Sequence, residues 1–189
     1  MKLLKINKKK VARGFTLVEV LLVVGFIALA SIGVYVVYNK VQTGNAANTE
    51  SRNIDTVRAG IKNIYGGSTN YNGLTETIAL NARIVPDTMR STASQGGTIQ
   101  NSFGGTVTIA SATFGSGVAD NAFAITYNNV PLDVCAKLTT SAGVGFNKVT
   151  VNGTTVKDTS TSTGNTINVA TVASSCNLDA GNVLVFTSL

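Results

Sequence analysis

Residues 15 to 38 read FTLVEVLLVVGFIALASIGVYVVY, a run of 24 residues in which only Thr16, Glu19 and Ser31 are frankly polar. At a rise of about 1.5 Å per residue, an α-helix of this length is about 36 Å long, which is enough to cross a bilayer with some tilt. We therefore predict a transmembrane helix over residues 15–38. It divides the chain into a short N-terminal part and a long C-terminal part.

The net charge of +6 comes from the residues ahead of this run. Six of the 15 basic residues precede residue 15 without any acidic residue among them, so the rest of the chain is formally neutral. Basic residues beside a membrane helix hold that end in the cytoplasm, and the C-terminal part is then expected on the other side. A neutral remainder gives no electrostatic reason to expect nucleic acid as a partner.

The composition argues against an enzyme. The chain of 189 residues has no His and only two Cys. It therefore lacks the commonest general base and the ligands of the usual zinc sites. It also has no phosphate-binding loop of the GxxxxGK type. We expect no catalytic residue, no cofactor and no metal.

A cleaved secretory signal peptide is the first alternative for the N-terminal region, because a basic start and an apolar run are its ordinary parts. The run is longer than a typical signal core. It is followed at residues 38–44 by YNKVQTG, which is a weak cleavage site. The sharp small-residue junction lies ahead of the run instead, between Gly14 and Phe15.

The sequence GFTLVE at residues 14–19, with basic residues before it and an apolar helix after it, resembles the processing signal of the type IV pilin family. The resemblance implies that a prepilin peptidase removes a leader of residues 1–14 by cutting between Gly14 and Phe15, and that the new amino group of Phe15 is methylated. It also implies an inner-membrane precursor, an assembly ATPase with its inner-membrane platform, and self-association into a helical homopolymer.

Glu19 is the most informative residue of this signal. A carboxylate near the start of a membrane helix costs about 1 to 3 kcal/mol unless it finds a partner. The resemblance implies that Glu19 meets the freed amino group of Phe15 on a neighbouring subunit, which fixes the axial register of the two subunits. The alternative is an acid favoured by the helix dipole that snorkels to the interface.

Two glycines, Gly25 and Gly33, interrupt the apolar run. Glycine costs about 1 kcal/mol relative to alanine inside an ordinary helix. In a membrane bundle it permits close approach of helices, or a local bend. We predict a role in packing or flexibility, and the alternative is that both are ordinary small residues of a membrane span.

Residues 39–65 are expected to continue the helix as an amphipathic segment. No proline interrupts them, and Ile54, Val57, Ile61 and Ile64 recur at the spacing of one helical face. The pair Gly66-Gly67 then stops the helix.

Residues 66–189 are predicted to form a globular α/β head in which glycines separate short β-branched runs. We predict a short helix at residues 75–82 and another just after Pro131. Strands are expected at residues 106–109, 122–127, 149–151, 167–172 and 183–187. The predicted fold class is α+β, with a mostly antiparallel sheet packed on the second half of the long helix.

Cys135 and Cys176 are the only cysteines. A lone pair in one domain outside the cytoplasm predicts a disulfide that ties the C-terminal region to the head. A redox-active pair is the alternative, but the spacing is unlike CxxC.

The head resembles the type IVb branch of the pilin family. Residues 64–66, 71–74, 84–87 and 101–105 are similar to segments of the bundle-forming pilin and of conjugative thin-pilus pilins. The leading hypothesis is therefore the major pilin of a type IV pilus that serves adhesion, aggregation, motility or conjugation. A major pseudopilin of a type II secretion system or a minor pilin are the nearest alternatives. A membrane-anchored extracytoplasmic binding module is an alternative of a different class.

Overall fold

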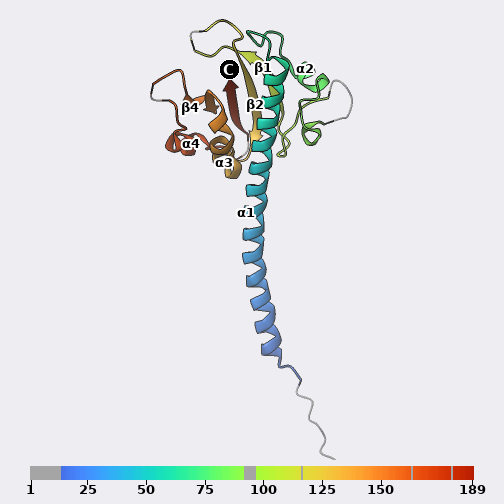
Figure 1. The fold of residues 1–189 in the computed structure, drawn as a ribbon. Coiled ribbons are helices and arrows are strands. Elements are labelled where there is room, and N and C mark those ends of the chain that lie inside the picture. Colours follow the sequence, from blue (N-terminus) through green and yellow to red (C-terminus); the bar gives the residue numbers. More distant parts are fainter. Residues whose placement is uncertain (1–13, 92–96, 116, 163, 180) are drawn as a thin grey trace, which may run out of the picture. The chain divides into compact units, whose positions relative to one another are not determined.

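The computed structural model describes residues 14–91, 97–115, 117–162, 164–179 and 181–189. The chain divides into two compact units, the first ending at Val41 and the second spanning Gln42–Leu189. One helix, α1 (Leu17–Ile64), supplies residues to both units (Figure 1). We call the second unit the head.

The head contains a five-stranded sheet with the strand order β1-β2-β5-β3-β4, in which every neighbouring pair is antiparallel. The strands are β1 (Val107–Ala112), β2 (Ala122–Val130), β3 (Lys148–Val151), β4 (Thr154–Asp158) and β5 (Asn182–Ser188). The remaining elements are α2 (Glu76–Asn81), α3 (Leu132–Ala142), α4 (Val169–Ser175) and two 3-10 turns, η1 (Asp87–Met89) and η2 (Gly143–Gly145). In Figure 1, α3 and α4 lie on one side of the head portion of α1, and α2 lies on the other. The predicted α+β class is confirmed.

The core of the head forms where one face of the sheet meets α1. Along the central strands, Tyr127 and Phe186 are fully buried, whereas Thr126 and its neighbour Val185 on β5 are only partly buried. This alternation is the period-two pattern of a sheet with one face in the core. The buried residues of α1 in the same cluster are Ala47, Ile54, Val57 and Ile61.

The predicted apolar stripe on α1 is therefore largely confirmed. Its fourth member, Ile64, is 42% exposed because it is the last residue of the helix. The helix stops ahead of Gly66-Gly67, as predicted. The two predicted shorter helices, α2 and α3, are also confirmed. Thr75 caps α2 by accepting a hydrogen bond from the Ile78 N–H.

The structure differs from the sequence prediction at two elements. The strand predicted at residues 167–172 was wrong, because this segment forms α4. The Asn168 side chain caps it by accepting from the Thr171 N–H at 3.0 Å. The strand β4 was not predicted. It follows a tight turn at Asn152 and Gly153, whose φ angles of 49° and 81° suit a two-residue hairpin loop.

Candidate functional site

The predicted processing junction lies just ahead of the first helix. Gly14, Phe15 and Thr16 precede α1, and the Phe15 side chain is 82% exposed. A Cβ added at Gly14 would meet no atom within 4 Å. Residues 1–13, the rest of the predicted leader, lie outside the described residues. The junction is thus non-helical and unobstructed within the described part of the chain.

Glu19 lies in the first turn of α1, where its backbone takes part in a helix cap. The Thr16 hydroxyl accepts a hydrogen bond from the Glu19 N–H at 3.3 Å, and the Thr16 carbonyl accepts from the Val20 N–H at 3.2 Å. Thr16 is therefore the N-cap, and Glu19 holds the position that glutamate favours in a capping box. This arrangement fits the helix-dipole interpretation of Glu19 and leaves its carboxylate exposed.

The first part of α1 is apolar around its whole circumference. Among the described residues, α1 is the one helix that is long and apolar enough to cross a membrane. No residue in its most apolar stretch is buried. The hydroxyl of Ser31 donates to the Ile27 carbonyl at 2.8 Å, so this polar group is satisfied within the helix itself. Side chains added at Gly25 or Gly33 would meet nothing within 4 Å. The surface is thus free to contact lipid or other helices.

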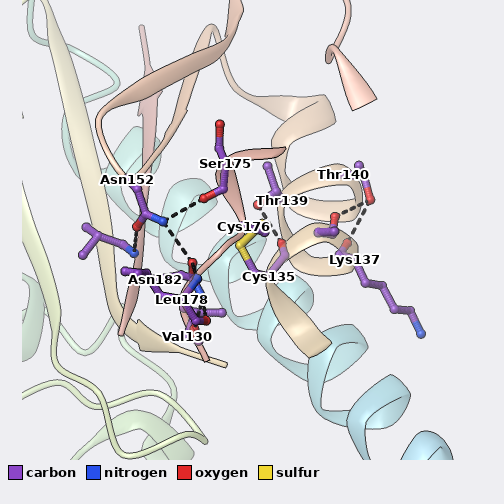
Figure 2. The surroundings of a disulfide bond; sticks show 12 residues. Val130, Cys135, Lys137, Thr139, Thr140, Asn152, Ser175, Cys176, Leu178 and Asn182 are labelled. Atoms are coloured by element: carbon purple, nitrogen blue, oxygen red, sulfur yellow. Dashed lines mark hydrogen bonds between the residues drawn. A yellow bond between two sulfur atoms is a disulfide. The ribbon is translucent and has the colours of Figure 1, made fainter. Parts of the chain in front are cut away.

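The disulfide links Cys135 of α3 to Cys176, the residue that follows α4. Figure 2 shows the bond between the sulfur atoms of Cys135 and Cys176. The Cα atoms of the two cysteines are 5.8 Å apart. Both cysteines are buried. The predicted pairing is confirmed.

A buried amide network lies beside the disulfide (Figure 2). The fully buried Asn182 donates to the carbonyls of Val130 and Leu178 at 2.9 and 2.6 Å, and it accepts from Asn152 at 2.9 Å. Asn152 also donates to the Ser175 carbonyl at 2.8 Å. These bonds join the hairpin turn, the end of α4 and the start of β5, so the disulfide region is held by polar contacts as well.

One buried acid, Glu50 of α1, was not predicted from the sequence. Its carboxylate accepts hydrogen bonds from the backbone N–H of Ser102 at 2.8 Å, from the Ser102 hydroxyl, and from the Tyr127 hydroxyl at 3.1 Å. Its side chain is completely buried. A buried carboxylate is tolerated when donors satisfy it. Glu50 therefore fastens the loop at Ser102 to α1 and to the centre of the sheet.

Burial, and then the Glu50 carboxylate that it faces, raise the pKa of the Tyr127 hydroxyl well above its ordinary value. The folded state therefore keeps this proton after the unfolded chain has lost it. Because protonated Tyr127 is favoured in the folded state, its contribution to folding stability is complete below the ordinary tyrosine pKa of about 10. This contribution is lost as the pH rises above that value.

We expect Tyr127→Phe to flatten this alkaline loss of stability. The measurement is urea unfolding of the full chain in detergent between about pH 9 and about pH 11. Tyr65→Phe is the matched control and should keep the original slope. An equally steep fall in Tyr127→Phe would contradict the assignment.

The described residues contain no group of three or more His, Cys, Asp or Glu that could hold a metal ion. The described residues present an uncovered apolar helix and a disulfide-bonded head. This arrangement supports association of the helix with lipid or with other protein.

Comparisons with known proteins agree with this geometry. The family model described as PilS N terminal matches residues 44–189. The chain is 31% identical over 108 residues to the major structural subunit of the bundle-forming pilus of Escherichia coli O127:H6 (strain E2348/69 / EPEC) and of Escherichia coli O111:H-. The alignment covers 57% of this chain and 55% of each relative, so the chain spans about half the length of these relatives.

Two solved structures share the fold. The type IV b pilin from Salmonella typhi gives a TM-score of 0.56 at 26% identity, and the match covers 74% of this chain and 97% of that pilin. TcpA, a type IV pilin from the Vibrio cholerae El Tor biotype, gives a TM-score of 0.56 at 17% identity, and the match covers 77% of this chain and 99% of TcpA. At this identity the match shows the fold alone. The class defined by fold and helix is therefore the type IV pilins, in agreement with the predicted IVb resemblance. The chain belongs to the PilS N-terminal family.

Proposed function

We propose that this chain is a structural subunit, the major pilin, of a type IV pilus. The observation that carries the proposal is the apolar part of α1, which has no buried residue in its most hydrophobic window. A continuous apolar surface of this size requires cover by lipid or by other protein. The curated relatives are major structural subunits of a pilus, which supports cover by further copies in a filament.

The subunit begins as a precursor in the inner membrane, with its N-terminus in the cytoplasm and its head in the periplasm. Prepilin peptidase cuts between Gly14 and Phe15 and methylates the new amino group. The support is the exposed, non-helical junction and the Gly14–Glu19 motif. Glycine suits such a cut because a residue without a side chain lets extended backbone enter a narrow groove.

Assembly moves α1 from lipid into a bundle of helices. Because lipid tails are as apolar as leucine, this transfer changes the hydrophobic free energy little, and packing and polar contacts decide it. In the proposal, the Glu19 carboxylate pairs with the amino group of Phe15 on the next subunit. The assembly ATPase and its platform supply the work, and the filament serves adhesion, aggregation, motility or conjugation.

The proposal is tested on cells that express the full chain together with a complete type IV assembly system. We expect surface filaments that can be sheared off, and this chain should account for most of their protein. Deletion of the gene should remove the filaments. If the chain stayed in the membrane as a monomer while filaments formed from another subunit, the major pilin role would be wrong.

A further inference from the structure

A groove in the head lies between α1 and the end of α3, and its volume is about 610 Å³. Its charged lining comes from α1, with Asp55, Arg58 and Lys62, and its opposite wall includes Ala142, Val144 and Gly145. We call it the basic groove. It is outside the disulfide region and the predicted processing and assembly residues.

Arg58 is held in place within the groove. Its guanidinium lies over the Phe146 ring, 5.2 Å from the ring centre. A Cβ at Gly145 would collide with its Nη1 atom, so glycine leaves the room that the guanidinium occupies. Its Nε is buried and has no hydrogen-bond partner among the described residues. A guanidinium is therefore preorganised with donors to spare.

The charges around the groove are mostly positive. Arg58 and Lys62 stand four residues apart on one helix, a spacing at which like charges repel. Behind the wall, Lys157 donates to the carbonyls of Gly143 and Val144 at 3.1 and 2.8 Å. Burial, and then the charge of Arg58, lower the pKa of both lysines.

The groove has little negative charge of its own. Asp55 is its one acid, and an Asp55 oxygen lies 3.9 Å from Nη1 of Arg58 with the side chain 56% exposed. An exposed pair at this distance is weak. A further carboxylate would relieve the repulsion between Arg58 and Lys62.

The head surface carries acids that complement the groove. The head has eight basic and eight acidic residues, so two copies have no net charge to keep them apart. Besides the buried Glu50, four acids of the head form no ion pair within the described residues: Glu76, Asp120, Asp133 and Asp179. Complementary local charges on neutral bodies favour specific contact and fix its register.

We propose that the basic groove binds an acidic side chain on the head of a second copy of this chain, with the carboxylate between Arg58 and Lys62. The inference rests on the proposed filament function and names a contact within it. Arginine holds a carboxylate through paired hydrogen bonds, and the apolar wall at Ala142 and Val144 accommodates the stem of the incoming side chain.

The test is zero-length crosslinking of sheared filaments with a water-soluble carbodiimide, which joins a lysine amine to a carboxylate in direct contact. We expect a covalent dimer whose linked peptides contain Lys62 and an acidic residue of another copy. Lys62→Arg keeps the positive charge but removes the reactive amine, so this dimer should disappear from the filaments that the variant forms. Lys148→Arg is the matched control and should keep it.

A second variant tests the energetics. Lys62→Glu should lower filament yield by about tenfold or more, because it faces the partner carboxylate with a like charge. Arg52→Glu, on the exposed surface of the same helix outside the groove, should assemble within about twofold of the original. An intact disulfide on a non-reducing gel confirms that each head has folded.

Filaments in which Lys62→Arg leaves the dimer unchanged, or in which Lys62 links only to Asp55 of its own chain, would overturn this inference and leave the filament function standing. Equal loss of yield in both glutamate variants would also overturn it. Absence of filaments from the unaltered chain would overturn the filament function and this contact together.

Discussion

Glu19→Ala is expected to leave the precursor folded and cleaved but to lower the yield of surface filaments by about tenfold or more. The reason is that the amino group of Phe15 would enter an apolar helix bundle without its partner. An uncompensated buried charge costs about 3 to 5 kcal/mol, which exceeds the near-zero change in hydrophobic free energy when helices leave lipid. The measurement compares sheared filament with membrane precursor by immunoblot.

Two further variants separate charge pairing from helix capping. Glu19→Gln keeps the length of the side chain and its place in the capping box but removes the charge, so it should fail as Glu19→Ala does. Thr16→Ala removes the hydroxyl that accepts from the Glu19 N–H and keeps the carboxylate. It should cost about 1 kcal/mol of helix stability and still assemble. Abundant filaments from Glu19→Gln would contradict the pairing.

Loss of the disulfide is the second large effect. The double variant Cys135→Ser and Cys176→Ser opens a link between residues 41 apart in the sequence. The chain-entropy treatment of such a loop gives about 4 kcal/mol of lost stability. This is a large share of the 5 to 15 kcal/mol that stabilises a typical domain. We expect a markedly lower urea midpoint for the full chain in detergent.

Reduction of the original protein provides a matched comparison, because it opens the same link without changing the sequence. The reduced protein and the double serine variant should both lose helical signal from the region of α4. In both, the amide network at Asn182 should continue to hold the start of β5. Substituting Ser174, an exposed residue of α4, with alanine should change the free energy of unfolding by less than about 0.5 kcal/mol. An unchanged midpoint after removal of both cysteines would show that the link contributes little.

Local patterns were sufficient to predict most of the fold. The apolar stripe at Ile54, Val57 and Ile61 predicted the face of α1 that lies in the core. Glycine-bounded runs of β-branched residues marked β1, β2, β3 and β5 near their observed positions. These elements follow local rules because each has one face in the core and a turn at its end.

The α4 segment shows where the local pattern failed. Its β-branched residues favour a strand, but the capping side chain of Asn168 and the tether at Cys176 stabilise a short helix. Tertiary context overrides intrinsic propensity in such short segments. The sequence feature that indicates a helix here is Asn168, a capping residue directly ahead of the segment.

The polar contacts of the head could not be predicted from sequence. Glu50 meets Ser102 and Tyr127 only after residues 52 and 77 positions away are brought to it. The basic groove likewise needs α1 and the turn after α3 to lie together. The roles of Gly14, Phe15, Glu19, Gly25 and Gly33 stay predictions, because they concern partners that act on or surround the isolated subunit.

The central claim is that one apolar helix lies first in lipid and later among copies of itself, with Glu19 setting their register. The most direct measurement is the intact mass of the protein in sheared filaments. We expect a chain that begins at Phe15, heavier by one added methyl group and lighter by the two hydrogens lost in the disulfide. A product cut downstream of the helix and recovered as a free soluble head would contradict the account.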